Sequence, residues 1–457
     1  MTLIKSISGI RGTIGEKPGE GLTPLDIVKF TSAWAMWARN QEKKEKYRVI
    51  IGRDARISGN MVNHLVCGTL MGMGMDVVDL GMATTPTVEM AVMFNNADGG
   101  IIITASHNPA EWNALKLLNN KGEFLSASDG EELLEAADNE AFDYSGVYEL
   151  GRYIPEQGSA MKHIEAILAL PLVDVSLIKS RNFRIAIDCV NSVGGPILPK
   201  LLRALGVKEV IELYCEPNGM FPHNPEPLPE NLKELSDKVV SAKADLGFSV
   251  DPDVDRLAII NEDGTMFGEE YTLVAVADYV LSNTPGNTVS NLSSTKALGE
   301  IAAGYGGKHY SSAVGEVNVT EEMKRTKAVI GGEGNGGVIY PELHYGRDAL
   351  VGIALFLTHL SKQGVRCSEL RKRYPDYYLS KNKVQISPDV DLDKLLNKIK
   401  NSFPGLPVTD IDGIRIDFPD GWVHLRKSNT EPIIRIYSEG PDKKHAQDLA
   451  SKVTKHL

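Results

Sequence analysis

Residues 101–109, Ile-Ile-Ile-Thr-Ala-Ser-His-Asn-Pro, join three β-branched apolar residues directly to a polar turn. The same abrupt change from an apolar run to a polar or glycine-rich loop recurs after Tyr47–Ile51, Phe183–Ile187, Leu246–Val250 and Ala328–Ile330. A short apolar run bounded by turn residues is typical of a strand buried on both faces of a parallel sheet. Ligands of such sheets bind beyond the carboxyl ends of the strands, so these polar loops are the candidate functional sites.

Helical patterns lie between these runs. The stretch Leu25–Arg39 follows Thr23, which can cap a helix, and Pro24, which fits a first turn. One face of this stretch is apolar and carries Ile27, Phe30, Trp34 and Trp37. Strands that alternate with helices predict an α/β fold.

The chain of 457 residues is too long for one hydrophobic core, because cores stop growing at roughly 250–300 residues. We expect breaks after the acidic, glycine-containing stretch 126–151, near residue 260, and around Arg371–Asp376. The predicted domains are therefore residues 1–150, 151–260, 261–370 and 371–457. The last domain shows an antiparallel set of strands closed by a helix, at Gly413–Phe418, Trp422–Leu425, Ile433–Tyr437 and Lys443–His456.

Composition and charge argue against several classes of protein. The net charge of −11 disfavours a nucleic-acid or acidic-membrane partner, because both need a basic surface. No apolar run is long enough to span a bilayer, and we expect no secretory leader. The four cysteines lie far apart, so we interpret them as reduced thiols of a cytoplasmic protein: Cys67, Cys189, Cys215 and Cys367.

The loop after the first quoted strand is a candidate site for a phosphorylated group. A serine held on a turn, Ser106, is accessible from a cleft, and His107 and Asn108 can orient a phosphate that Lys116 neutralises. Taken alone, the hexapeptide Thr104–Pro109 is better explained as an ordinary Ser/Asn/Pro turn. A serine hydrolase is disfavoured because no G-x-S-x-G elbow surrounds the serine.

A second loop carries three carboxylates at alternate positions, Asp251, Asp253 and Asp255. In an extended loop they can point to one side, where hard oxygen ligands suit Mg²⁺. A solvated acidic turn is the alternative, but nothing in such a turn would relieve the repulsion between the three carboxylates. An EF-hand is rejected because its sixth position needs glycine and holds Arg256.

Two further loops carry side chains suited to bind hydroxyl groups and a phosphate. In the glycine-rich run 331–337, Glu333 and Asn335 can hydrogen-bond vicinal hydroxyls. A flexible turn is the competing interpretation, and the run has neither P-loop nor dinucleotide-binding spacing. In the run 426–432, Arg-Lys-Ser-Asn-Thr-Glu-Pro, fork-shaped cations and polar donors suit a phosphate dianion. A cationic hairpin turn is the competing interpretation of this last run.

Together and in this order, the four motifs resemble the α-D-phosphohexomutase superfamily, and the resemblance extends from Ser8-Gly9-Ile10-Arg11-Gly12 to Arg435. It implies four domains around a central cleft: three similar α/β domains with mixed sheets, and a smaller C-terminal α+β domain. It also implies an enzyme that interconverts hexose 6-phosphate and hexose 1-phosphate through a phosphoserine and a bisphosphate intermediate.

The resemblance assigns roles to individual residues. Ser106 takes the transferable phosphate, and one Mg²⁺ per chain is bound by Asp251, Asp253, Asp255 and the Ser106 phosphate. The catalytic group also includes His107, Lys116 and Arg11. The substrate is bound by Arg256, Glu333, Asn335, Arg426, Ser428, Asn429, Thr430 and Arg435. The implied partners are small-molecule sugar phosphates, with a hexose bisphosphate as activator, and we expect a monomer or homodimer.

The sequence departs from the family at one point and is distinctive at another. Many relatives have a histidine shortly after the sugar-binding glutamate, where this chain has Gly336-Gly337, so the general base stays open between Lys116, Arg11 and His107. The Glu-Gly-Asn loop resembles that of archaeal-type enzymes and N-acetylglucosamine-phosphate mutases. It favours glucosamine phosphate as the substrate, with a phosphomannomutase or phosphoglucomutase as the alternative.

Two other functions stay open. A haloacid-dehalogenase-like sugar phosphatase would use Asp251 as its nucleophile, since 248–254 partly matches that signature. It would leave the serine, sugar and phosphate loops unexplained. A sugar-phosphate sensor without catalysis would need no phosphorylatable serine and no metal loop, and both are present.

Overall fold

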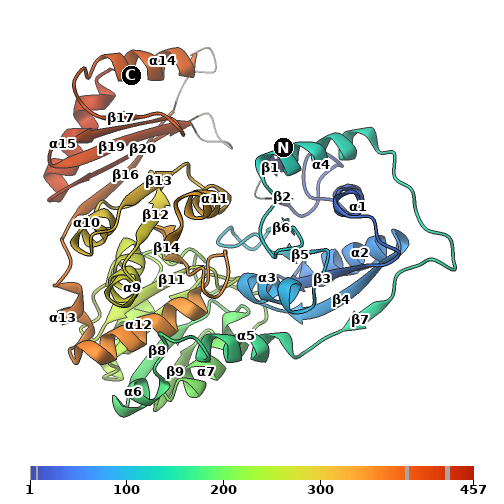
Figure 1. The fold of residues 1–457 in the computed structure, drawn as a ribbon, viewed down its shortest axis with the longest axis horizontal. Helices are drawn as coiled ribbons and strands as arrows, with labels where there is room; N and C mark the ends of the chain where they lie inside the picture. Colours follow the sequence, from blue (N-terminus) through green and yellow to red (C-terminus); the bar gives the residue numbers. More distant parts are fainter. Residues whose placement is uncertain (1, 7–8, 386–390, 428–432, 457) are drawn as a thin grey trace. The chain divides into compact units, whose positions relative to one another are not determined.

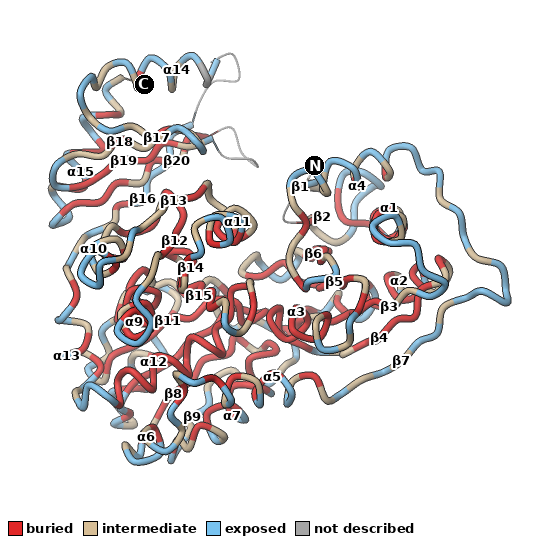
Figure 2. Tube along the Cα trace, viewed as in Figure 1, coloured by how far each residue is buried: buried red, intermediate tan, exposed pale blue. Residues whose placement is uncertain are grey.

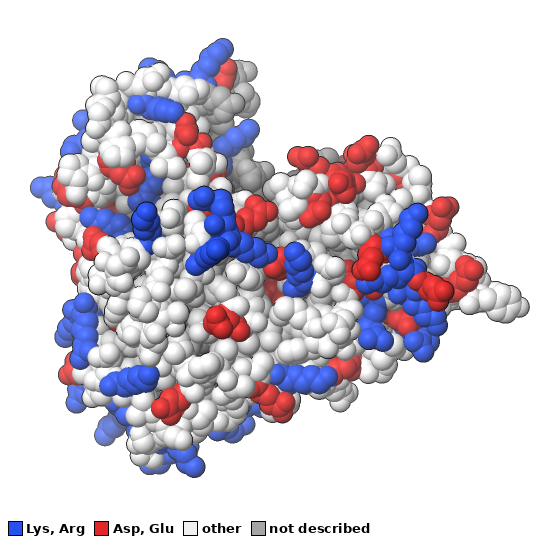
Figure 3. Space-filling view, viewed as in Figure 1, with Lys and Arg blue, Asp and Glu red and all other residues white. Residues whose placement is uncertain are grey.

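The computed structural model describes residues 2–6, 9–385, 391–427 and 433–456 (Figure 1). The chain forms two compact units, the first from residues 1–272 and 335–370 and the second from residues 273–334 and 371–457. Within the described ranges, no helix is long and apolar enough to cross a membrane. Figure 3 shows basic and acidic side chains interspersed over the face that it draws.

The first unit begins with a mixed seven-stranded sheet in the order β1-β2-β6-β5-β3-β4-β7. Strands β3, β4, β5 and β7 are mutually parallel, whereas β6 runs antiparallel to both β5 and β2. The strands are β1 Ile4–Ser6, β2 Gly9–Thr13, β3 Tyr47–Arg53, β4 Met75–Met82, β5 Gly99–Ile103, β6 Trp112–Leu118 and β7 Tyr153–Pro155.

Helices cover both faces of this sheet. Val49 and Ile51 of β3 pack on one side with α1 (Pro24–Gln41), α2 (Gly59–Gly72) and α4 (Ala127–Asn139). Ile50 points to the other side, toward α3 (Thr85–Phe94). The central strands are therefore buried on both faces, as the unbroken apolar runs predicted (Figure 2).

Helix α1 confirms the predicted cap. The Thr23 side chain accepts a hydrogen bond from the Asp26 backbone N–H, and the Asp26 carboxylate accepts one from the Thr23 backbone in return. This reciprocal pair satisfies two of the N–H groups that a helix start leaves free, and Pro24 occupies the first turn.

A second sheet completes the α/β core of the first unit, in the order β11-β10-β8-β9. The parallel part is as predicted, but β11 returns antiparallel to β10, so the aspartate loop is the turn of a hairpin. The strands are β8 Arg184–Asp188, β9 Glu209–Leu213, β10 Leu246–Val250 and β11 Leu257–Asn261. The helices of this region are α5 Ser159–Leu168, α6 Val175–Ser180, α7 Gly194–Ala204 and α8 Lys233–Ser241.

Four elements complete the first unit or lie at its boundary with the second. Strand β15 (Gly337–Ile339) and helix α12 (Ala349–Gln363) belong to it, and α12 is buried along most of its length. Helices α9 (Glu269–Asn283) and α13 (Cys367–Arg371) lie where the chain passes from one unit to the other.

The second unit has a parallel sheet in which β12 (Asn287–Asn291) lies between β13 (His309–Ser312) and β14 (Ala328–Glu333). Helices α10 (Ala297–Gly304) and α11 (Glu316–Thr326) accompany it. Strand β14 continues through Gly331, Gly332 and Glu333, which the sequence placed in a loop. The glycines stay in the strand because the β12 backbone and the Met323 side chain leave no room for a side chain at Gly331.

The C-terminal part of the second unit is the predicted antiparallel sheet, in the order β16-β20-β19-β18-β17. Its two outer strands and helix α14 were not predicted. The elements are β16 Tyr378–Gln385, α14 Leu392–Asn401, β17 Val408–Thr409, β18 Ile414–Phe418, β19 Gly421–Lys427, β20 Ile433–Gly440 and α15 Lys443–Thr454.

Candidate active site

The carboxyl ends of strands β5 and β10 bring the serine loop and the aspartate loop of the first unit together. The Ser106 Oγ donates a hydrogen bond to the Asp251 Oδ2 at 2.6 Å, although 145 residues separate the two in sequence. This edge of the sheets is where the polar loops were expected to lie.

The serine loop is held in a conformation unusual for its residues. Ser106 has a φ of 49°, in the left-handed region that side chains other than glycine seldom adopt. Its backbone N–H donates to the Thr104 Oγ1 at 2.9 Å, and the Thr104 hydroxyl donates to the Asp54 Oδ2 at 2.7 Å. These bonds fix the turn, which presents the Ser106 hydroxyl to the aspartate loop.

Arg56 is a positioning residue of this loop that the sequence did not reveal. Its guanidinium is almost fully buried, and its Nε donates to the Asp54 Oδ2 at 3.0 Å. Its remaining donors reach four backbone carbonyls of the serine loop: those of Ser106, Asn108, Pro109 and Trp112. The available signal in the sequence was the second arginine of Gly-Arg-Asp-Ala-Arg, which begins at the end of β3.

The aspartate loop is a tight turn and not the extended segment predicted. Val254, a β-branched residue, has a φ of 64° between Asp253 and Asp255. The turn places one oxygen of each of the three aspartates within 4.8 Å of the others, and all three residues are buried. The strained valine is the reason that three alternate carboxylates converge.

Buried charges of both signs face each other in this site. Burial and the neighbouring Asp255 and Asp253 carboxylates raise the pKa of Asp251 well above its usual value. Burial by itself would also raise the pKa of Asp253. The Lys116 ammonium lies 2.7 Å from the Asp253 Oδ2 and has the larger effect, so the pKa of Asp253 is lowered. Thr85 also donates to that oxygen, at 2.6 Å. In return, the two facing carboxylates overcome the effect of burial and raise the pKa of Lys116.

The residues of the aspartate turn fit a hard divalent cation. Asp253 Oδ1 and Asp255 Oδ1 are buried and accept no hydrogen bond from the described part of the chain. A buried carboxylate oxygen that accepts no hydrogen bond is unfavourable, and a cation relieves both that cost and the mutual repulsion. The oxygen-only donor set is the one that Mg²⁺ prefers.

Arg347 is a second residue that the sequence did not reveal. Its Nη2 lies 2.7 Å from the Asp255 Oδ2, and the residue is buried. A Cβ on Gly337 would stand 2.3 Å from the Arg347 Cδ, so only glycine leaves room for this arginine. The Gly336-Gly337 pair, noted above as a departure from the family, was the available signal.

The other predicted residues of the first unit are His107, Arg11, Arg256 and Asn335. Burial, Arg256 and Arg11 lower the pKa of His107 well below its usual value. Burial and Arg256 likewise lower the pKa of Arg11. The Arg256 Nη1 lies 3.3 Å from the Glu226 Oε1. The Asn335 Oδ1 accepts a hydrogen bond from the Gly337 N–H at 3.2 Å.

Glu333 belongs to the second unit, where it ends strand β14 and is buried. Its Oε1 accepts hydrogen bonds from the Asn291 Nδ2 at 2.8 Å and from the Gly315 N–H at 3.2 Å. Asn291 ends the neighbouring strand β12 and therefore holds one side of this carboxylate. The sequence did not predict this contact, because the two residues lie far apart in the chain.

A row of cations crosses the C-terminal sheet. Arg426 of β19 lies directly opposite Arg435 of β20, and Arg435 lies opposite Lys383 of β16. Like charges opposite one another destabilise a sheet, so this row favours a bound anion. In the described part of the chain, the Asp412 Oδ2 lies 3.4 Å from the Arg426 Nε. The predicted residues Ser428, Asn429 and Thr430 lie outside the described residues.

Four family models match the chain in succession. They are the phosphoglucomutase/phosphomannomutase α/β/α domain I at residues 3–144, domain II at 161–264, domain III at 268–378, and the C-terminal domain at 381–456. Together they account for most of the chain in four domains, three of them α/β/α, as predicted.

Individual relatives agree with these matches. The chain is 36% identical over 444 residues to a phosphoglucomutase/phosphomannomutase of Thermococcus kodakarensis, covering 96% of this chain and 95% of the relative. It is 32% identical to a phosphoglucosamine/phosphogalactosamine mutase of Sulfurisphaera tokodaii, covering 98% and 97%. A crystal structure of a phosphoglucomutase/phosphomannomutase family protein from Burkholderia thailandensis matches with a TM-score of 0.85 at 27% identity, covering 99% and 98%.

Proposed function

The chain belongs to the α-D-phosphohexomutase superfamily, and we propose that it interconverts glucosamine 6-phosphate and glucosamine 1-phosphate. The hydrogen bond between the Ser106 hydroxyl and the buried Asp251 carboxylate carries this proposal, because it joins a phosphate carrier to a cation site. The amino sugar is supported by the Glu-Gly-Asn loop and by relatives named for phosphoglucosamine.

Each group of the site has a separate part in the proposed reaction. Ser106 carries the phosphate, and Asp251, Asp253 and Asp255 hold Mg²⁺. When bound, this ion neutralises charge that develops on the transferred phosphoryl group. Lys116 stays protonated because two carboxylates face it, so it acts as a fixed positive charge.

The phosphoryl group moves twice in one turnover. The bond from phosphorus to the Ser106 Oγ breaks as a bond to a substrate hydroxyl oxygen forms, and the hydroxyl proton leaves to a base. After the bisphosphate has reoriented, its other phosphate returns to Ser106. Of the three candidate bases, we propose His107, whose Nδ1 lies 3.5 Å from the Ser106 Oγ.

Coupled assays with glucosamine 6-phosphate, mannose 1-phosphate and glucose 1-phosphate test the substrate. We expect kcat/KM to be highest for glucosamine 6-phosphate. A higher value for mannose 1-phosphate or glucose 1-phosphate would overturn the amino-sugar assignment and leave the mutase assignment intact. Phosphate labelling that is labile to hydroxylamine would instead indicate an acyl phosphate on Asp251 and a phosphatase-like reaction.

We expect Arg426→Ala to weaken substrate use by roughly 10–150-fold, because charge-assisted hydrogen bonds contribute about 1.5–3 kcal/mol each. Arg426 is proposed to grip whichever phosphate is not reacting, so kcat/KM should fall in both directions of the reaction. Escape of the bisphosphate should also rise, which makes activity more dependent on added glucosamine 1,6-bisphosphate.

Two variants serve as controls for this test, one within the row of cations and one outside it. Lys383→Ala should cause a smaller loss in both directions, since a single ammonium lacks the fork of a guanidinium. Arg325→Ala removes an exposed arginine that pairs with Glu322 on the surface of α11, and kcat/KM should stay unchanged. A loss in one direction only would show that Arg426 recognises a single phosphate position.

We propose that Arg347 balances the charge of Asp255 and attracts the substrate phosphate. Arg347→Ala should lower kcat/KM by roughly 10–100-fold, because a charge-assisted contact to phosphate is lost. The same change should lower the Mg²⁺ concentration needed for half-maximal activity, because a cation beside the carboxylates has been removed.

The variant Arg347→Lys distinguishes the effect of the positive charge from the effect of the guanidinium's shape. It keeps the positive charge, so the Mg²⁺ requirement should remain near that of the parent enzyme while kcat/KM recovers in part. If Arg347→Ala changed only thermal stability, and neither kinetic quantity moved, Arg347 would be a structural residue alone.

A further inference from the structure

A second buried cluster lies in the first unit, outside the active-site loops. His163 comes from α5, His344 from the segment before α12, and Asp348 caps the start of α12. The Nε2 of His163 lies 3.0 Å from the Asp348 Oδ2, and the Nε2 of His344 lies 3.4 Å from the same oxygen. All three side chains are almost fully buried, and one atom of each lies within 4.8 Å of the others.

The spacing of these atoms suits one tetrahedral metal ion. Zinc binds imidazole nitrogen and carboxylate oxygen at about 2.0–2.2 Å, so two tetrahedral ligands stand roughly 3.3–3.5 Å apart. The two nitrogen–oxygen distances, 3.0 and 3.4 Å, require little adjustment to reach that geometry. The Asp348 Oδ1 accepts from the backbone at the start of α12, which fixes the orientation of the carboxylate.

The second nitrogen of each ring also has a partner. The His163 Nδ1 lies 3.0 Å from the Thr87 Oγ1, and the His344 Nδ1 lies 3.3 Å from the Glu89 Oε2. Metal-bound histidines almost always donate their other ring N–H to such a group. Gly346 permits the Glu89 contact, since a Cβ there would lie 2.0 Å from the Glu89 Oε2.

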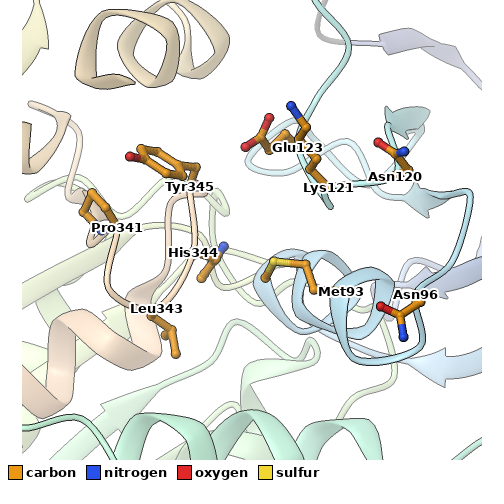
Figure 4. Close-up of a pocket in the computed structure, with 9 residues that line it drawn as sticks. All are labelled: Met93, Asn96, Asn120, Lys121, Glu123, Pro341, Leu343, His344 and Tyr345. Atoms are coloured by element: carbon orange, nitrogen blue, oxygen red, sulfur yellow. The ribbon is translucent and has the colours of Figure 1, made fainter. Parts of the chain in front are cut away.

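One residue of the cluster borders a cavity. His344 lines a cavity of about 360 Å³ together with Met93, Leu343 and Tyr345. In the close-up of Figure 4, His344 lies on the cavity wall between Leu343 and Tyr345.

We propose that His163, His344 and Asp348 bind one zinc-class transition-metal ion, separate from the magnesium site, with the fourth position open to water. Two imidazoles favour zinc over magnesium, which prefers oxygen ligands. The ion ties α5 to the start of α12, and α3 supplies the outer partners Thr87 and Glu89.

Equilibrium dialysis of the full chain against zinc chloride, with Mg²⁺ in large excess, tests the site. We expect one zinc per chain by mass spectrometry, and a higher melting temperature in the zinc-bound form. His163→Gln and His344→Gln should each lose this zinc. Thr87→Val leaves all ligands in place and removes one outer partner, so zinc affinity should fall about 10–100-fold.

Two control variants exclude other sources of zinc binding. His223→Gln removes an imidazole that contacts the buried Asp188 elsewhere in the same unit, and it should retain the zinc. Asp253→Asn alters the magnesium site and should also retain it. The proposal is overturned if the parent chain holds no more zinc than His163→Gln, which would identify the cluster as a buried ion-pair network only. It is equally overturned if Asp253→Asn alone removes the zinc.

Discussion

Turnover should fall by more than about 10³-fold when Ser106 is replaced by alanine, because the phosphate then has no carrier. The hydroxyl is held at the end of β5 and donates to the buried Asp251 carboxylate, and the described chain offers no other hydroxyl to that oxygen. The measurement is kcat with the preferred hexose phosphate, together with the intact mass of the purified enzyme. The active parent should show a fraction that is heavier by one phosphate, mapped to Ser106, and the variant should not.

A matched control separates loss of the carrier from loss of a buried hydroxyl. Ser438→Ala removes a buried serine that donates to the Ala446 carbonyl at 2.8 Å in the C-terminal sheet. Both variants lose one buried hydrogen bond, so both should unfold at a similar temperature, but only Ser106→Ala should lose turnover. Activity close to that of the parent in Ser106→Ala would disprove the phosphoserine mechanism.

Replacing Asp253 by asparagine should lower kcat by roughly 10²–10³-fold and raise the Mg²⁺ concentration needed for half-maximal activity. The amide has nearly the shape of the carboxylate but lacks its charge. Lys116 would then face only Asp255, at 3.5 Å, and the buried Oδ1 that suits a cation would belong to a neutral group. Titration of activity with Mg²⁺, after removal of metal with a chelator, measures both effects.

Asp79→Asn is the control for this variant. Asp79 is also buried in the first unit, on β4, where Asn63 and Tyr153 donate to it, and it takes no part in the aspartate turn. Its replacement should affect stability and leave the Mg²⁺ titration unchanged. Full activity of the chelated parent enzyme, or an unaltered titration in Asp253→Asn, would show that the three aspartates do not hold the catalytic ion.

The strands that end at the active site were predictable because the pattern that marks them is local. Short, mostly apolar runs followed by turn residues identify β5 and β10 whatever surrounds them. The cap of α1 depends on Thr23 and Asp26, which are three residues apart, so it too could be predicted from the sequence. Candidate residues such as Ser106 and the three aspartates follow directly from where those strands stop.

Other features depended on residues that are distant in sequence. Arg56 holds carbonyls more than 50 positions away, and Arg347 reaches Asp255 across 92 positions. Valine is common in extended strands, so the sequence did not reveal that Val254 has a positive φ, which turns the aspartates toward one another. None of these could be inferred from spacing, because each depends on which loops the packed sheets place side by side.

Local chemistry therefore decided where this chain has strands, where its first helix begins and which loops carry reactive groups, because hydrogen bonding and periodic burial act over a few residues. Packing decided the rest: the charge balance around Lys116, the glycine that makes room for Arg347, and the convergence of His163, His344 and Asp348. Burial shifts the pKa values of such groups and selects their partners, and burial exists only once distant segments have come together.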